Sequence, residues 1–460
     1  MNLIYHDNLR LQIENVSPDQ LRPSPNNPRR HIQRQIEMLV RNIMEHGFLV
    51  PALVNDDNEI IAGEARWRAA IQLGLTSIPV IRISHLTPAQ IRAFRIADNR
   101  LAQKAEWDME ILARELNFLA KFDISFDFEA VGFETAEVDL LLDGPASASS
   151  KLDDLPPLHA QVPAVSTLGD IWCLGHHRLL CGSALDPASY DQLFERRLAT
   201  AVITDPPYNV PIDGHVCGIG QVKHREFAMA SGEMTDTEFT GFLNTSLGLA
   251  ARFSRDGALH YVFMDWRHLP HLFAAAGSIY GELKNICVWN KTNAGMGSLY
   301  RSKHELVAVY KVGNVPHINN IELGRHGRYR TNVWDYAGIN SFGRDRDSLL
   351  AIHPTVKPVA LIGDAIKDCT RRGDLVLDPF CGSGTTIIAA EKTGRVAAAI
   401  EIDPHYVDAA VRRWQQMTGR VATLLATGDT FAQCEAWQGS DQPGPRLLAG
   451  RLANDEGDQT

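Results

Sequence analysis

The feature that most constrains the fold is a short apolar run that leads through a glycine-rich turn into a helical stretch. Asp374-Leu-Val-Leu-Asp378 is followed by Pro-Phe-Cys-Gly382-Ser-Gly384-Thr-Thr386, and residues 387–393 continue with a helical pattern. A strand that passes through glycines into a helix is the building unit of doubly wound, mostly parallel α/β sheets, which bind ligands at such turns. The sequence therefore predicts an α/β fold with a site at this turn.

Further apolar runs, separated by longer mixed stretches, repeat this pattern at 201–204, 258–264, 284–289, 306–310 and 396–400. Strands that alternate with helical stretches are typical of an open parallel sheet. Glu401 follows the last run, about 20 positions after the glycine turn, where an acid can hold ribose hydroxyls. No Gly-Lys-Ser/Thr follows the turn, which argues against a triphosphate-binding loop.

A second motif, Thr204-Asp205-Pro206-Pro207-Tyr208, comes directly after the run 201–204. Two successive prolines hold the backbone extended and leave carbonyl oxygens with few nearby N–H donors. The exocyclic amino group of a base is a poor nucleophile because its lone pair is delocalised, so a site must accept its protons. The Asp205 carboxylate and the Pro206 carbonyl can accept them, and Tyr208 can stack on a base turned out of a duplex.

Together these motifs resemble the DNA amino-methyltransferases, whose signature is D-P-P-Y with an F-x-G-x-G cofactor loop. The catalytic motif precedes the loop, as in the permuted beta group of that family. The resemblance covers residues 168–419 and includes the hairpin Ile171–Gly182 and the segment His353-Pro-Thr-Val-Lys-Pro358. It implies a Rossmann-like methyltransferase domain that uses S-adenosyl-L-methionine and acts on double-stranded DNA.

The resemblance also implies residue roles. The catalytic residues would be Asp205, Pro206, Pro207 and Tyr208, and the cofactor-binding residues would be Asp378, Phe380, Gly382, Gly384, Thr385, Glu401, Thr355 and Lys357. One departure is that the family hairpin commonly ends C-G-D-S, whereas this chain has Cys181-Gly-Ser183-Ala. An acidic contact is therefore missing, and Asp186 is a candidate substitute. The aspartate of the D-P-P-Y motif favours N6 of adenine, and N4 of cytosine is the alternative.

The segment between Tyr310 and His353 is the predicted DNA-recognition segment. It mixes arginines with aromatic residues, which suits phosphate contact and base stacking. We expect DNA contacts from Arg325, Arg328, Arg330 and Arg344. The alternative is a solvated loop with a few packed aromatics. For Arg301, Lys303 and His304, a charged strand edge is the preferred interpretation.

Near the start of the chain, Asn27-Pro-Arg-Arg30 and Gly63-Glu64-Ala-Arg66-Trp-Arg68-Ala-Ala resemble the two boxes of ParB-type partition proteins. This resemblance implies a small α+β, ParB/sulfiredoxin-like domain with a nucleoside triphosphate at Gly63, Glu64, Arg66 and Arg68. The alternative is a helix start with a solvated basic face. Sulfiredoxin chemistry is excluded because no cysteine precedes Cys173, and the helical pattern from Thr87 to about Leu119 lacks a convincing helix-turn-helix signature.

The predicted organisation is a ParB-like domain with a helical extension (1–143), a Pro/Ala/Ser-rich linker (144–167), the methyltransferase domain (168–420) and a polar tail (421–460). Within the first domain we expect a helix ending at Gly47, a hairpin over 52–62, a helix from Glu64 to about Gly74 and a strand over 78–83. Seven scattered cysteines predict reduced thiols, no disulfide framework and no metal site. Lacking an apolar leader or long apolar run, the chain is expected to be cytoplasmic.

These observations predict a site-specific, adenine-N6 DNA methyltransferase of bacterial or phage type, related to restriction-modification enzymes. The net charge of −10 lowers the expectation of tight non-specific DNA binding without excluding a basic cleft. A different class of function is a nucleotide-gated, ParB-like DNA-binding adaptor with an inactive methyltransferase half. The intact Asp205, Tyr208, Gly382, Gly384 and Glu401 argue against that alternative. The sequence leaves the oligomeric state and the target site open.

Overall fold

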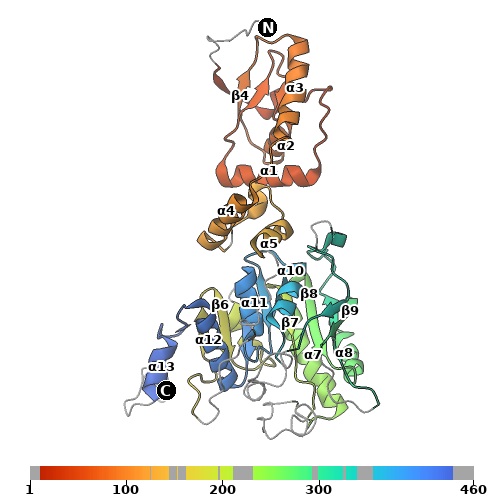
Figure 1. The fold of residues 1–460 in the computed structure, drawn as a ribbon, viewed down its shortest axis with the longest axis vertical. Helices are drawn as coiled ribbons and strands as arrows, with labels where there is room; N and C mark the ends of the chain where they lie inside the picture. Colours follow the sequence, from red (N-terminus) through yellow and green to blue (C-terminus); the bar gives the residue numbers. More distant parts are fainter. Residues whose placement is uncertain are drawn as a thin grey trace, which may run out of the picture. The chain divides into compact units, whose positions relative to one another are not determined.

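The computed structural model describes residues 11–124, 126–143, 153, 162–194, 197–210, 230, 232–292, 299–324, 328–338 and 356–438. The chain divides into two compact units, Met1–Gly144 and Pro145–Thr460, and Figure 1 labels several of their elements. Of the predicted site residues, Thr355, Arg325 and Arg344 lie outside the described residues.

The first unit contains a four-stranded sheet in the order β1-β4-β2-β3, which consists of β1 (Ile13–Val16), β2 (Ala52–Val54), β3 (Ile60–Ala62) and β4 (Ile78–Arg82). The predicted hairpin is confirmed, because β2 and β3 pair antiparallel. Helix α1 (Gln33–His46) ends at Gly47, whose φ of 82° suits glycine. Helix α2 (Glu64–Gln72) follows β3 directly, as the pattern predicted.

The helical stretch predicted from Thr87 to about Leu119 consists of two helices, α3 (Pro88–Ala102) and α4 (Met109–Phe122). A second helix starts because Asp108 accepts hydrogen bonds from the backbone N–H groups of Glu110 and Ile111, which is an N-cap. The 3-10 helix η2 (Phe128–Val131) and helix α5 (Thr135–Asp143) follow. A small apolar cluster joins these elements and contains Leu112, Leu116, Phe128 and Val138.

The second unit is built on a ten-stranded sheet in the order β11-β9-β10-β8-β7-β12-β13-β6-β5-β14. Its strands are β5 (Ile171–Leu174), β6 (His177–Cys181), β7 (Ala199–Thr204), β8 (Ser254–Met264), β9 (Glu282–Asn290), β10 (His304–Lys311), β11 (Val333–Asp335), β12 (Leu375–Asp378), β13 (Val396–Glu401) and β14 (Thr423–Leu424). The central strands β8, β7, β12, β13 and β6 run parallel. Strand β10 lies antiparallel between β8 and β9. The predicted doubly wound, mostly parallel α/β fold is confirmed.

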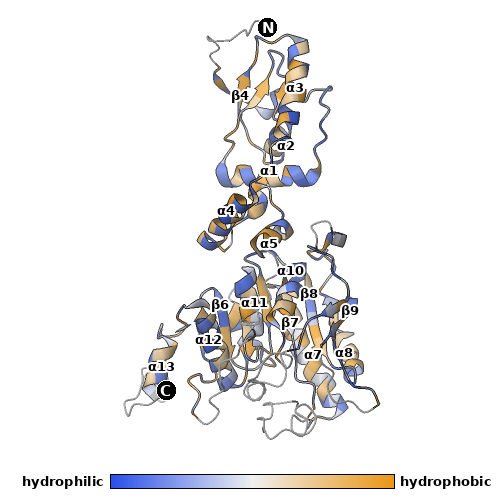
Figure 2. Cartoon of the chain, in the orientation of Figure 1, coloured by the Kyte–Doolittle hydropathy of each residue, from blue (hydrophilic) through white to orange (hydrophobic). Residues whose placement is uncertain are grey.

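Helices cover both faces of this sheet, which separates two apolar clusters. Tyr261 and Phe263 of β8 belong to the cluster with α10 (Val359–Cys369), α11 (Thr385–Thr393) and α12 (Pro404–Thr418). Val262 and Met264 belong to the cluster with α7 (Asp236–Arg252) and α8 (Leu269–Ala276). Successive side chains of one strand thus serve opposite faces. Apolar colouring gathers on the strands in Figure 2.

The described residues of the second unit also form two shorter helices, α6 (Pro187–Phe194) and α13 (Phe431–Gln438), and the 3-10 helix η4 (Glu322–Gly324). Val165 and Ser166, at the end of the predicted linker, are buried, and their backbone N–H groups donate to Asp408 on α12. These two residues are therefore part of the folded unit. Among the helices of the described ranges, none combines the length and the apolar character that crossing a membrane requires.

Helix α11 is held at its last turns by the Glu391 carboxylate. His177 of β6 donates to it from Nε2 (3.0 Å), because its Nδ1 accepts from the backbone N–H of Ala397. Trp414 Nε1 of α12 donates to the same carboxylate oxygen (2.9 Å), and Arg420 pairs with it. Despite burial, these donors lower the pKa of Glu391 to about 2. One carboxylate thus ties α11 to β6 and to α12.

Candidate active site

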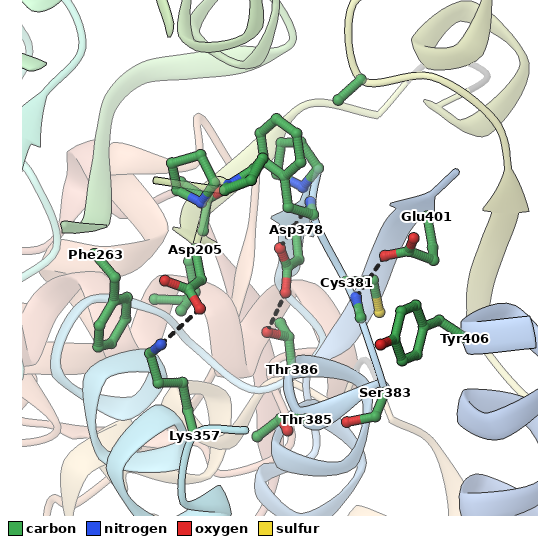
Figure 3. Close-up of a pocket in the computed structure, with 18 of the residues that line it drawn as sticks. Asp205, Phe263, Lys357, Asp378, Cys381, Ser383, Thr385, Thr386, Glu401 and Tyr406 are labelled. Carbon is green, nitrogen blue, oxygen red and sulfur yellow. Dashed lines mark hydrogen bonds and ion pairs between the residues drawn. The ribbon is translucent and has the colours of Figure 1, made fainter. Parts of the chain in front are cut away.

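A pocket of about 1120 Å³, including its open mouth, lies at the carboxyl ends of β7, β12 and β13. It is lined by most of the predicted catalytic and cofactor-binding residues, namely Asp205, Pro206, Pro207, Tyr208, Lys357, Asp378, Phe380, Gly382, Thr385 and Glu401. Figure 3 shows Asp205 and Lys357 on one side, Glu401 and Tyr406 on the other, and Asp378 between them. The fold therefore brings both sequence motifs to one cavity.

The glycine turn forms the floor between the two sides. The Asp378 carboxylate accepts from the backbone N–H of Phe380 (3.1 Å) and from Thr386 Oγ1 (2.6 Å), which fixes the turn onto α11. Burial raises the pKa of Asp378 to about 7. Gly384, at the start of α11, has a φ of 84°, and a Cβ there would lie 2.8 Å from the Ala410 Cβ. Gly384 therefore allows α11 and α12 to approach closely and is not among the lining residues.

Glu401 ends β13, the strand next to β12. Its Oε2 accepts from the backbone N–H of Gly382 (2.7 Å) and its Oε1 from that of Asp403 (2.9 Å). Burial raises the pKa of Glu401 to about 7. The carboxylate has lone pairs beyond these two bonds and faces the cavity, so it can accept further hydrogen bonds from a ligand.

Asp205 follows β7 on the opposite side. Its Oδ2 accepts from Lys357 Nζ (2.6 Å), and its Oδ1 accepts a short hydrogen bond from the Tyr208 hydroxyl. Burial raises the pKa of Asp205, while the Lys357 ammonium opposes that shift. Burial and the neighbouring Asp205 carboxylate raise the pKa of Tyr208, which keeps its phenol protonated. The two acceptor oxygens of Asp205 are thus aligned by donors of this chain.

Lys357 lies beside Asp205, whereas the sequence resemblance assigned it to the cofactor. Its Nζ also contacts Glu305 Oε2 (3.0 Å), and it lies over the Phe263 ring at 5.1 Å. Lys291 pairs with the other oxygen of Glu305. The sequence reasoning missed Glu305 and Lys291. The available signal was an acid at the start of an apolar strand, directly after the cations 301–304.

Within the described residues, Asp186 does not take the place of the acid missing after the lead-in hairpin. The Ser183 hydroxyl accepts from the backbone N–H of Leu185 (3.2 Å). The exposed Asp186 caps the start of α6 by accepting from the backbone N–H of Ala188 (3.0 Å). Gly182 and Ala184 line the cavity and Asp186 does not. The suggested substitution by Asp186 is therefore wrong.

The predicted DNA contacts Arg328 and Arg330 are engaged inside the unit. Arg328 Nη2 donates to Asp368 Oδ1 (2.5 Å), Arg330 Nε donates to Asp368 Oδ2 (3.0 Å), and only 4% of the Asp368 side chain is exposed. Arg330 also donates to the Tyr336 hydroxyl and lies over the Trp334 ring. These arginines hold the segment 328–336 onto α10. Their ion pairs with Asp368 show a structural role, and the predicted DNA contact of these two arginines stays a prediction.

In the first unit, the two predicted boxes face one another. Gly63 has a φ of 94° at the start of α2, where Glu64 accepts from Asn27 Nδ2 (2.6 Å) and Arg68 Nη2 (2.6 Å). A hollow is lined by Gly63, Glu64, Arg66, Asn27, Arg29 and His31, among others. Burial lowers the pKa of Arg66. Arg68 lines an adjoining hollow with Arg29 and Arg30.

The mostly parallel sheet places an acid and a glycine turn in one cavity with a proline-rich motif, an arrangement that suits a nucleotide-type ligand. Residues 199–412 match the family model of DNA methylases, whose name joins N6 and N4 methylation. Residues 6–99 match the ParB N-terminal domain, and residues 110–168 match the ParB-methyltransferase HTH domain. In sequence order, the chain thus carries a ParB-type domain, an HTH domain and a DNA methylase domain. The expectation of no helix-turn-helix was wrong.

Two curated relatives cover the methylase part. Type II methyltransferase M.HpaI of Haemophilus parainfluenzae is 22% identical over 250 residues, which is 51% of this chain and 73% of that protein. Type II methyltransferase M2.MboI of Moraxella bovis is 23% identical over 248 residues, 52% of this chain and 87% of that protein. The crystal structure of the M1.HpyAVI-SAM complex aligns with a TM-score of 0.38 and 20% identity, covering 51% of this chain and 97% of that one.

Proposed function

We propose that this protein is a site-specific DNA methyltransferase that transfers a methyl group from S-adenosyl-L-methionine to N6 of adenine. The observation that carries the proposal is that Asp205 and Glu401, from motifs far apart in the sequence, line one cavity. One side offers acceptors for an amino group, and the other offers an acid at the end of a strand for ribose hydroxyls.

The lining of the cavity fits this cofactor. It contains four carboxylates and one ammonium group, Asp205, Asp378, Glu401, Asp403 and Lys357, so its charge suits a ligand with a sulfonium and an ammonium group. Tyr406, Ile402 and Phe380 supply apolar surface beside Glu401.

When bound, the cofactor supplies an electrophilic methyl group. The protein's own residues make the amine competent to receive it. Asp205 accepts an amino proton of the target base, and the Pro206 carbonyl is the second acceptor, so nitrogen gains electron density as it is methylated. Tyr208, held by its hydrogen bond to Asp205, offers a ring for stacking of the extruded base. This is catalysis by position and electrostatics.

The test is incubation of the full chain with unmethylated DNA and isotope-labelled cofactor, followed by mass analysis of the nucleosides. N6-methyl-2′-deoxyadenosine supports the proposal, N4-methyl-2′-deoxycytidine moves the activity to the other amino group, and absence of product supports the adaptor alternative. Asp205→Ala should abolish transfer and leave S-adenosylhomocysteine affinity nearly unchanged. Asp186→Ala is the matched control, because this acid lies outside the cavity, and it should keep full activity.

For the first unit we propose that a nucleoside triphosphate binds where the two boxes meet. The left-handed Gly63 and the first turn of α2 offer backbone donors, and the neighbouring hollows add guanidinium groups of Arg29, Arg66 and Arg68. Glu64 organises the site by holding Arg68 and Asn27. Titration of the full chain with each nucleoside triphosphate should give saturable binding that Arg66→Ala weakens.

A further inference from the structure

The carboxyl edge of the sheet carries a second surface beside the cavity. Strand β8 ends at Met264, and β10 begins opposite it, because Leu306 pairs with Met264. Strand β9 ends at the same edge, because its last residue Asn290 pairs with His304. Residues 265–268, after β8, and residues 299–303, before β10, therefore lie together at this edge. These two segments are called the rim below.

The rim exposes aromatic side chains. Trp266 is 53% exposed and Tyr300 is 84% exposed. Within the described part of the second unit, one further aromatic side chain, that of Tyr329, is more than half exposed. Exposure of a tryptophan to water is unfavourable because its ring is largely apolar. An exposed tryptophan and an exposed tyrosine at the same edge of the sheet therefore point to a binding surface.

The rim is also basic. It carries Arg267, Arg301 and Lys303, with the Arg267 guanidinium 5.3 Å from the Trp266 ring centre. The acids at this edge, Asp265, Glu305 and Asp335, each accept a hydrogen bond from a side chain of this chain. Asp265 accepts from both the backbone N–H and the ring of His268 (2.9 and 2.6 Å), which fixes the turn that bears Trp266.

The rim lies within reach of any DNA that delivers a base to Asp205. In the order β7-β8-β10-β9, β8 is one strand and β10 two strands away from β7. At about 4.8 Å per strand, the rim segments lie roughly 5 to 10 Å to the side of the catalytic motif. That distance corresponds to about one and a half to three nucleotides at 3.4 Å each. The electrostatic influence of Asp265 on Tyr208 is consistent with this proximity.

We propose that the rim binds the DNA that flanks the target base. Trp266 and Tyr300 stack on bases exposed when the duplex opens, and Arg267, Arg301 and Lys303 contact phosphates. This inference rests on the proposed function, because that function places the target base of the DNA at Asp205. Arg328 and Arg330 are paired with Asp368, and the proposal assigns DNA contacts to residues of the β8–α8 turn and of the approach to β10.

The test uses the full chain and a fluorescently labelled duplex with a short unpaired bubble, followed by anisotropy at several salt concentrations. Trp266→Ala with Tyr300→Ala should weaken binding roughly five- to 150-fold for each base that no longer stacks on an aromatic ring. Arg267→Ala with Arg301→Ala and Lys303→Ala should reduce the slope of log affinity against log salt by about 0.9 for each phosphate that the variant no longer neutralises.

Two control variants lie at the opposite edge of the same sheet. Arg255→Ala, at the start of β8, and Leu283→Ala, at the start of β9, should leave DNA affinity unchanged. All variants should bind S-adenosylhomocysteine like the wild type, because the rim residues do not line the cavity.

Wild-type DNA affinity and salt dependence in both rim variants would overturn the inference. A change in oligomeric mass by light scattering, without a change in DNA affinity, would also overturn it in favour of a protein interface. If the wild type methylates DNA but the rim variants bind normally, only the rim fails. If the wild type gives no methylated product and the rim variants still bind DNA more weakly, the proposed function fails and the rim stands.

Discussion

Replacement of Lys357 by methionine tests the electrostatics of the cavity most directly. Lys357 lies between Asp205 (2.6 Å) and Glu305 (3.0 Å), with 6% of its side chain exposed. Methionine keeps much of the volume and removes the charge, so two carboxylates lose their shared partner. Breaking a buried ion pair by removing one partner costs about 3–5 kcal/mol. We expect Lys357→Met to lower the free energy of unfolding of the second unit by that amount.

The pH dependence follows from the same contacts. Although burial opposes ionisation, Lys357 and Lys291 lower the pKa of Glu305 to about 2. This depressed pKa contributes stability that is complete above about pH 4.5 and is lost as the pH falls towards 2. In Lys357→Met that pH dependence should be shallower. The pKa of Asp205 should rise, because burial is no longer opposed, so the acidic limb of the kcat profile should move to higher pH.

The assay is urea unfolding followed by tryptophan fluorescence, together with kcat between pH 6 and 9. Glu305→Gln is the partner variant, and Lys357→Met with Glu305→Gln closes a double-mutant cycle. The double variant should cost less than the sum of the single variants, because it no longer leaves Glu305 buried without its cation. Additive costs, or a Lys357→Met enzyme with an unshifted kcat profile, would refute this account of the cavity.

Three further variants probe other parts of the second unit. Burial raises the pKa of Glu401 to about 7. The affinity of the wild type for S-adenosylhomocysteine, measured by calorimetry, should therefore rise from pH 6 to 8. Glu401→Gln should bind this ligand at least about tenfold more weakly, and its affinity should depend less on pH. Gly384→Ala should destabilise the unit by about 1–3 kcal/mol in urea, because φ is 84° and its Cβ would meet Ala410; unchanged stability would contradict this. Arg330→Ala should also destabilise the unit, because Asp368 loses a partner. It should leave the salt dependence of DNA binding unchanged, and a reduced slope of log affinity against log salt would support the predicted DNA contact of Arg330.

The sequence predicted those parts of the site that are contiguous in the chain. Asp205 to Tyr208 and Asp378 to Gly384 each carry a strand, a turn and its chemistry within a few residues, so local patterns suffice. Glu305 could not be found in this way. It reaches Lys357, the partner of Asp205, because β10 runs antiparallel beside β8, and the strand order of a sheet is not written in the local pattern.

The arginines of the predicted recognition segment show a related limit. Arg328 and Arg330 stand among aromatics, a composition that suits nucleic acid as well as a packed loop. Their partner Asp368 lies on α10, well downstream in the sequence, and only the fold brings it near. The division between α3 and α4 was missed for a local reason. The Asp108 cap interrupts a continuous helical pattern, and a pattern of apolar spacing does not register such a break.

The attachment of α11 through Glu391 has a consequence for the energetics of ligand capture. The helix whose first turn borders the cavity is fastened at its far end to a strand and to another helix, through His177, Trp414 and Arg420. The helix that follows the glycine turn is therefore held in place before a cofactor binds, and we expect little conformational entropy to be lost there on binding. Cutting this attachment with Glu391→Gln should slow cofactor association and leave the lining residues themselves intact. The affinity for the cofactor thus depends in part on contacts at the end of α11 that lies away from the cavity.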